Sequence, residues 1–381
     1  MTTFLLMLAT ALPAAGDQAP PKANTLTPKE AADGWLLLFD GETRFGWNGP
    51  LLAANPDRYG PLDKGTKVEA GVLHLGGEKE VSIWASSAFG DFRLDFEYRQ
   101  EGPPGAVFRV HFQPSAVPAG GHGLFRAEAN GWHRCTTTAR GDRANGTYTL
   151  SRQHYAPGGA RLNDSSTISK SGYAVKLGFS VKAGTKLRLR NLKLQPLGLR
   201  PLFNGKDLAG WKAIPGKPSK FTVTKEGWLN VKDGPGDLQT KAKWADFVLQ
   251  LDCVSNGKHL NSGVFFRSLP GQFWSGYEAQ IRNQWQGNDR NKPVDFGTGG
   301  LYGRQPARKV VSSDKEWFTM TVSAHGKHIA IWVNGYQTVD FTDDRKGART
   351  DAGPVSIQGH DPTTDLSFRN IRVAELPKAG R

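Results

Sequence analysis

Short runs in which apolar and polar residues alternate recur along the whole chain. In residues 247–253 the alternation puts every second side chain, from Phe247 to Cys253, on one face of a strand. Residues 329–335 alternate in the same way and end in Asn-Gly, which is typical of a tight hairpin turn. No stretch shows a sustained helical period. The pattern predicts an all-β protein made of many short strands.

The chain also repeats its own motifs in the same order. Residues 39–47 match 203–211, and the further pairs are 71–75 with 227–231, 89–96 with 244–251, 105–109 with 263–267, 132–141 with 317–326, and 187–193 with 366–372. An ordered set of this size predicts two tandem copies of one domain, at 34–198 and 199–377. Each copy is predicted to fold as a two-sheet sandwich of the jelly-roll kind.

The two copies differ in one long segment. Between the motifs that end in Arg109 and Arg267 and the tryptophan motifs that follow them, the second copy is about twice as long as the first. The additional residues include 276–282 and 297–303, for which the first copy has no convincing counterpart. We therefore expect the first copy to be degenerate and the second to hold the active site.

The N-terminus has the features of a secretory leader. Residues 1–16 combine an apolar core with the small residues Ala14 and Gly16, although they contain no Lys or Arg. A short buried helix is the alternative, but the Pro-rich residues that follow offer nothing to bury it. We expect a leader at 1–16, a linker at 17–33 and a periplasmic or secreted protein. No other apolar run could span a bilayer, so no transmembrane segment is expected in the mature chain.

Composition supports the strand assignment and narrows the partners. The 46 Gly, 23 Pro and 20 Phe fit a turn-rich, all-β chain. The formal net charge of +14 raises the question of acidic partners, but the cations are scattered. The densest group, at 186–193, alternates with apolar residues as one solvated strand face does, and no nucleic-acid motif is present. Cys135 and Cys253 lie in different copies and are expected to be free thiols.

Strand parity gathers polar residues of the second copy on one surface. In 277–282, Glu278 and Gln280 share a face opposite the apolar residues. The same reasoning applies to 261–267 and 355–360. If these strands are neighbours, one face carries Asn261, Arg267, Glu278, Gln280, Gln358 and His360.

Several motifs of the second copy resemble the 3-keto-disaccharide hydrolase family. They are residues 202–211, 261–267, 276–281, 300–302, the strand of Trp317, and 368–371. The resemblance covers essentially all of the second copy and the framework of the first. It implies a concanavalin A-like fold, so the expected architecture is two tandem concanavalin A-like jelly-roll β-sandwiches. It also implies cleavage of glycosides whose sugar carries a ketone at C3.

Such a ketone makes the C2 proton acidic, so a base can remove it, the group at C1 can leave, and water can add to the enone. This route needs a base, a group that stabilises the enolate, and an acid. With the resemblance, Glu278 is the first choice for the base and His360 the second. Arg267, Gln280 or a metal would hold the enolate oxygen. The expected substrate contacts are Asn261, Gln280, Tyr302, Gln358 and Trp274.

Structural roles compete with each of these assignments. A lone Glu on a sandwich strand is usually solvated or paired, here with Arg282, and His360 could be a surface histidine. Arg267 has a match in Arg109 and could belong to the framework. Tryptophans shared by both copies, such as Trp317, are expected in the core. Those without partners are the better platforms for sugars, namely Trp274, Trp285 and Trp332.

Other chemistries are less consistent with the sequence. His360, Glu278 and Asp361 could bind a divalent metal, but no spacing is diagnostic. The Glu-x-Asp-x-x-Glu pattern of retaining glucanases keeps only its first member, Glu278, which argues against double displacement. The leading hypothesis is an enzyme that cleaves 3-keto-glycosides or 3-keto-disaccharides, as a hydrolase or a lyase. A non-catalytic, lectin-like glycan-binding module is the alternative, and an interaction domain of a surface assembly is a third.

Overall fold

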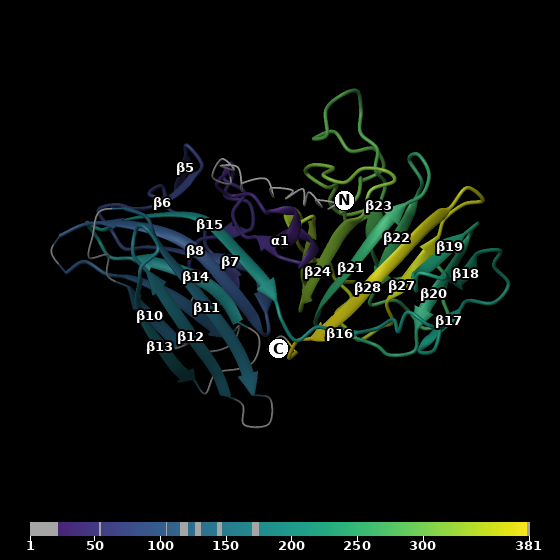
Figure 1. Cartoon of the computed structure of the whole chain (residues 1–381), viewed down its shortest axis with the longest axis horizontal. Coiled ribbons are helices and arrows are strands. Elements are labelled where there is room, and N and C mark those ends of the chain that lie inside the picture. Colours follow the sequence, from purple (N-terminus) through teal and green to yellow (C-terminus); the bar gives the residue numbers. More distant parts are fainter. Residues whose placement is uncertain are drawn as a thin grey trace, which may run out of the picture.

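A computed structural model describes residues 22–52, 55–103, 105–114, 121–125, 131–142, 147–169 and 175–378. The expected leader at 1–16 lies outside these ranges. The chain forms two β-sandwiches side by side, with the short N-terminal helix between them (Figure 1). The all-β class and the two sandwiches are confirmed.

The first half pairs a larger and a smaller antiparallel sheet. The larger has the order β13 (Arg161–Ser169), β12 (Thr147–Tyr155), β11 (His133–Asp142), β8 (Phe92–Glu101), β15 (Lys186–Pro196), β6 (Val72–Gly76) and β5 (Lys67–Glu69), with β1 (Leu36–Leu37) on β15. The smaller has the order β10 (Gly121–Phe125), β9 (Phe108–Pro114), β14 (Val175–Val181), β7 (Val81–Phe89) and β2 (Trp47–Asn48). A separate hairpin joins β3 (Leu51–Leu52) to β4 (Asn55–Tyr59).

The second half repeats this strand order. Its larger sheet runs β26 (Tyr336–Thr342), β25 (His328–Val333), β24 (Phe318–His325), β21 (Phe247–Ser255), β28 (Asp365–Glu375), β19 (Leu229–Lys232) and β18 (Lys220–Val223), with β16 (Arg200–Pro201) on β28. Its smaller sheet runs β23 (Tyr277–Ile281), β22 (Ser262–Phe266), β27 (Ser356–Gly359), β20 (Gly236–Thr240) and β17 (Trp211–Ala213).

Matching side chains also make matching contacts in the two halves. The indole of Trp47 donates to the Leu38 carbonyl over 2.6 Å, and that of Trp211 donates to the Leu202 carbonyl over 2.9 Å. Each indole thus ties the edge strand of the smaller sheet to the residue that follows the first strand of its half.

The second shared tryptophan differs from the expectation of a core residue. Trp132 and Trp317 are only partly buried. The guanidinium of Arg190 lies 4.1 Å from the ring centre of Trp132, and that of Arg369 lies 4.0 Å from the ring centre of Trp317. In each half the guanidinium covers one face of the indole ring, so that face is not available to a ligand.

The segment expected to be a linker is folded from residue 22 onward. Helix α1 (Pro28–Ala32) begins with a capping box, in which Thr27 and Glu30 satisfy each other's backbone N–H groups. Asn24 donates through its side chain to the Gly71 carbonyl over 2.8 Å, and Glu30 forms an ion pair with Lys193 at 2.9 Å. Within the described ranges, no helix is long and apolar enough to cross a membrane.

The two halves share an apolar interface. Val248, Ala330 and Trp332, on the outer face of the second half's larger sheet, join the hydrophobic core cluster of the first half. The Trp332 ring lies 6.0 Å from that of Phe89, and its indole donates to the Leu37 carbonyl over 3.3 Å. The hypothesis that Trp332 stacks on a sugar is therefore wrong, because the ring is buried between the halves.

Both cysteines are free and buried, as expected. Burial raises the pKa of the Cys135 thiol to about 12, so it stays protonated and unreactive.

Candidate functional site

The predicted strands are neighbours, and they place two rows of residues on the outer face of the second half's smaller sheet. One row follows the register from Asp237 through Gln358 and Gly263 to Gln280. The next row runs from Gln239 through Ser356 and Phe265 to Glu278. Apolar residues such as Leu238, Val264 and Ile357 alternate with them and fill the sandwich. Parity thus predicted the facing of Glu278, Gln280 and Gln358 correctly.

This face is covered by neighbouring loops and is not an open surface, and we call it the recess. Asp237, Gln280 and Gln358 are each 1% exposed, although they point away from the sandwich core. The loop before β23 covers one side, because the Gln239 side chain donates to the Gln272 carbonyl and accepts from the Gly271 N–H. The inserted segment after β23 covers the other side.

Several acceptor atoms of the recess have no protein partner. They are Asp237 Oδ1, Asn261 Oδ1, Ser356 Oγ and Gln358 Oε1, all buried. Leaving one buried polar group unsatisfied costs about 1–3 kcal/mol. Four such atoms on one face mark it as the candidate binding site for a ligand rich in hydroxyl groups, because buried polar groups are normally hydrogen-bonded.

Glu278 is packed into a notch made by a glycine. A Cβ added to Gly263 would lie 2.2 Å from Glu278 Oε1, so the carboxyl occupies the space that a side chain would fill. Burial raises the pKa of Glu278 to about 8, helped by the charges of Asp295 and Asp237 and opposed by a hydrogen bond from the Trp274 side chain. The carboxyl is therefore mostly protonated at pH 7.

Asp237 is a second carboxyl of the recess that sequence reasoning missed. Burial raises its pKa to about 6, while the Trp274 N–H, 3.0 Å from Oδ2, and the charge of Lys217 hold it down. The available signal was the short alternating run 236–240, in which Leu238 faces the core and Asp237 faces away.

His360 belongs to a polar cluster at one end of the recess. Asn261 Nδ2 lies 3.0 Å from Asp295 Oδ2 and 3.3 Å from His360 Nε2, and His360 Nδ1 lies 3.0 Å from Asp361 Oδ2. A neutral imidazole with its proton on Nδ1 satisfies both contacts. Gln280 donates to the Asp295 carbonyl over 3.0 Å, which ties the cluster to β23.

Asp295 was also missed, and its backbone is unusual. Asp295 and Phe296 have φ of +51° and +66°, in the left-handed region that non-glycine residues rarely adopt. Such conformations cost about 1–3 kcal/mol each and gather at functional sites. The sequence pattern of a loop gives no signal for them.

Aromatic residues stand at the edge of the recess. Trp274 is 52% exposed and Tyr302 is 39% exposed. Tyr302 extends the sheet beside β23, where its N–H donates to the Glu278 carbonyl over 3.0 Å. Trp285 has the Arg290 guanidinium 4.1 Å from its ring centre, so one of its faces is covered. Of the three tryptophans expected to stack on a sugar, Trp274 therefore remains the candidate.

Arg267 does not join the site, which corrects the expected catalytic role. Its φ of +51° turns the side chain out of the strand pattern, and it is 1% exposed. The guanidinium forms a 3.0 Å ion pair with Asp246, and its other bonds go to the carbonyls of Ala245, Gly326 and Arg349. Its donors are committed to holding the sheet edge.

The expected metal ligands do not form a metal site. Both ring nitrogens of His360 already contact Asn261 and Asp361. Across the described ranges, no group of three or more His, Cys, Asp or Glu side chains is arranged to hold a metal ion.

The equivalent face of the first half is filled by its own side chains. β10 occupies there the position of β23, which corrects the expectation that the insert has no counterpart. In the first half the sheet register pairs Val110 with Phe179, and in the second half it pairs Val264 with Ile357. Arg109, which precedes Val110, therefore takes the place of Gly263 and not of Arg267.

Further bulky groups complete this filling. Trp84 packs on Gly178, and its ring centre lies 5.2 Å from that of His111. The His111 ring contacts Ser180 Oγ at 2.7 Å. The notch that holds Glu278 in the second half is therefore closed in the first.

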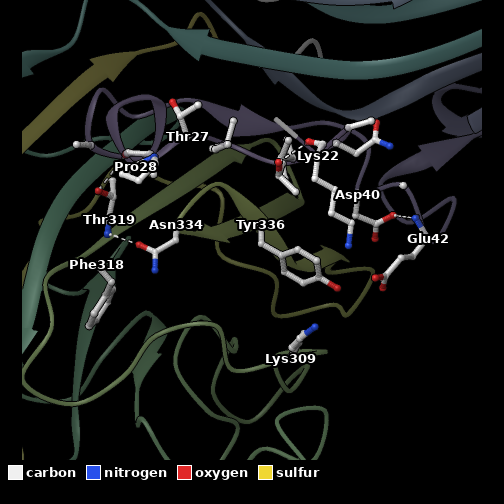
Figure 2. Close-up of a pocket in the computed structure, with 18 of the residues that line it drawn as sticks. Lys22, Thr27, Pro28, Asp40, Glu42, Lys309, Phe318, Thr319, Asn334 and Tyr336 are labelled. Atoms are coloured by element: carbon white, nitrogen blue, oxygen red, sulfur yellow. Dashed lines mark hydrogen bonds between the residues drawn. The ribbon is translucent and has the colours of Figure 1, made fainter. Parts of the chain in front are cut away.

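A cavity of about 930 Å³ lies elsewhere, between the N-terminal segment and the second half (Figure 2). Two of its polar groups already have partners: Thr319 N–H donates to Asn334 Oδ1 over 3.0 Å, and Asp40 forms an ion pair with Arg308. All of its lining residues are described, and none carries a buried polar atom without a partner. We therefore take the recess, and not this cavity, as the candidate functional site.

Fold and site together define a double β-sandwich protein with one recessed, acidic, polar site. Residues 198–374 match the model of a family described as a 3-keto-alpha-glucoside-1,2-lyase-like domain. The chain therefore carries one domain of this type, in its second half. The first half is shown as a sandwich of the same strand order and not as a second family match.

Comparison with solved structures gives distant similarities. A candidate glycosyl hydrolase of Parabacteroides distasonis is 22% identical, over 47% of this chain and 94% of its own, with a TM-score of 0.40. A carbohydrate-binding module of Bacillus subtilis is 17% identical, over 42% of this chain and 93% of its own, with a TM-score of 0.33. Among curated proteins, no match to the chain is found.

Proposed function

We propose that the second half cleaves neutral glycosides that carry a ketone at C3 of the sugar, by elimination of the group at C1, with or without addition of water. The observation that carries the proposal is the row of buried, unpartnered acceptor atoms beside two carboxyl groups with raised pKa values. A sugar offers the hydroxyl donors that these acceptors lack. The family match of residues 198–374 supports the ketone.

The charge of the recess favours an uncharged substrate. Its described side chains are mainly amides, hydroxyls and carboxyls, beside Phe265 and His360, and the cation Lys217 near them is exposed and lies 4.4 Å from the Phe273 ring centre. An acidic sugar would meet Asp237, Asp295 and Glu278 without a buried cation to balance it. We therefore infer a neutral hexose as the recognised unit.

The residues of the recess match the needs of the reaction. Removal of the C2 proton needs a base, and departure of the C1 substituent needs an acid, which two carboxyls of different pKa can supply. The Gln358 amide faces this space and can orient a substrate oxygen, whereas the Gln280 amide is held by Asp295. The leader expected at 1–16 lies outside the described residues, and on that expectation we propose that the activity is periplasmic or extracellular.

A lectin-like module without turnover is the second candidate. The exposed indole of Trp274 and the ring of Tyr302 at the rim favour it, because such rings stack on sugars in binding proteins as well as in enzymes. Binding and cleavage are separated by a single product assay.

A matched pair of sugars tests the proposal. We expect the protein to release the aglycone from a 3-keto-disaccharide and to leave the unoxidised parent disaccharide intact, because only the ketone acidifies the C2 proton. Products are followed by NMR, with and without a chelator. Binding of either sugar without any release would support the lectin, and equal cleavage of both sugars would indicate an ordinary glycosidase.

The notch at Gly263 gives a second prediction. Replacing Gly263 with Ala puts a Cβ where the Glu278 carboxyl now lies, so the carboxyl must move by an ångström or more. Displacements of this size cost about 10²-fold in rate. We expect kcat to fall by about that factor, with the circular dichroism spectrum unchanged.

The control for this variant is Gly347→Ala, at a site in the same half where an added Cβ meets nothing within 4 Å. Its kcat should equal that of the wild type. Full activity in Gly263→Ala would show that the position of Glu278 does not matter.

A further inference from the structure

We propose that Asp237 is the base that removes the C2 proton and that Glu278, across the same recess, donates a proton to the leaving oxygen at C1. This assignment rests on the proposed function and deepens it. It also reverses the role that sequence reasoning gave to Glu278.

The two carboxyls face each other across the recess. Asp237 and Gly263 stand in the same row with Gln358 between them, so their Cα atoms are two strand spacings, about 10 Å, apart. The Glu278 carboxyl fills the notch over Gly263 and therefore leans from its own row toward that of Asp237. Gln358, which lies between them, carries the unpartnered acceptor Oε1.

Trp274 connects the two carboxyls. Its N–H donates to Asp237 Oδ2 over 3.0 Å, and its side chain hydrogen-bonds to Glu278. One oxygen of Asp237 is thus fixed, while Oδ1 remains buried without a protein partner. An immobilised carboxylate with one free oxygen is what a base needs to meet a C–H bond.

The surroundings separate the two roles. Asp237 is faced by the cation Lys217 and receives the Trp274 N–H, whereas Glu278 is faced by the carboxylates Asp295 and Asp237. Their pKa values of about 6 and about 8 leave Asp237 ionised and Glu278 protonated between these limits. Two carboxyls pushed apart in this way mark a base and an acid.

The elimination needs no reactant other than the substrate and these two carboxyl groups. Asp237 takes the C2 proton, and the electrons of the C2–H bond form the enolate of the C3 ketone. The enolate then forms the C1=C2 double bond as the C1–O bond breaks, and the leaving oxygen takes the proton of Glu278. Asp237 ends protonated and Glu278 ionised. Addition of water at C1 is the reverse, with Glu278 as base and Asp237 returning its proton to C2.

Isotope exchange isolates the first step. A carbon-linked 3-keto-glycoside cannot lose its C1 substituent, so in D₂O the base alone determines the exchange of the C2 hydrogen. We expect exchange with the wild type and with Glu278→Gln, and a loss of at least 100-fold with Asp237→Asn. The reversed pattern, or exchange retained in a folded Asp237→Asn, would overturn the assignment while leaving the cleavage activity in place.

The wild type provides a measurement that needs no variant. Cleavage of an oxygen-linked 3-keto-glycoside should rise with pH near 6, as Asp237 ionises, and fall near 8, as Glu278 loses its proton. Exchange on the carbon-linked analogue should show only the rise. A fall of exchange near 8 would overturn the assignment. A wild type that neither cleaves nor exchanges would overturn the proposed function itself.

Discussion

Replacing Glu278 with Gln is expected to lower kcat for 3-keto-glycosides with poor leaving groups by about 10²–10⁴-fold. Gln copies the shape of the protonated carboxyl but has no proton to give to the leaving oxygen. The deficit should shrink with a nitrophenyl 3-keto-glycoside, because that leaving group departs without an acid. Steady-state kinetics on the two substrates provide the measurement.

Stability gives the same variant an independent readout. The folded pKa of Glu278, about 8, lies above its ordinary value of 4.5, so between these values the folded state binds more protons than the unfolded state. The contribution of Glu278 to the stability of the wild type must therefore fall as pH rises through this range. Gln does not titrate, so urea unfolding should show the variant gaining on the wild type from pH 5 to pH 8.

The matched control is Glu226→Gln, an exposed glutamate of the same half. It should change neither kcat nor the pH dependence of unfolding. Equal activity of Glu278→Gln and wild type on both leaving groups would remove Glu278 from the mechanism.

Replacing Arg267 with Ala is expected to lower the free energy of unfolding by about 3–5 kcal/mol. The change removes a fully buried cation from Asp246 and from three carbonyl oxygens, and breaking a buried pair from one side carries a penalty of this size. Urea unfolding measures it, and kcat per folded molecule should stay within a few-fold of the wild type.

The control for Arg267 is Lys220→Ala. Lys220 pairs with Asp233 on the surface, with side chains 75% and 39% exposed, and such pairs contribute about 0–1 kcal/mol. A large loss of kcat in Arg267→Ala without loss of stability would restore the catalytic role first expected for this arginine.

The polar face was predictable because it follows from period-two alternation. Glu278, Gln280 and Gln358 lie in regular strands, so parity alone put them on one side, and the structure then showed those strands to be neighbours. Arg267 escaped the same rule because its positive φ ends the alternation one residue after the strand. Parity has no information about where a strand stops.

Other features depended on pairings between distant segments. Asp237 lies on a strand whose one large apolar residue, Leu238, gives little alternation to recognise. Motif matching paired Arg109 with Arg267 because the two motifs have similar sequences. The hydrogen-bond register of the sheet, which the sequence does not show, gives a different pairing. Trp332 looked like an unpartnered aromatic residue because its contacts are supplied by the other half of the chain.

The apolar interface has a consequence for how the protein can be engineered. The stretch that matches the family model ends at residue 374, yet Leu376 and the outer-face residues Val248 and Trp332 belong to the hydrophobic core of the first sandwich. The boundary of the recognisable domain is therefore not the boundary of the cooperative unit. A transplant of the recess into another protein would expose these apolar residues to water unless it carried the first sandwich with it.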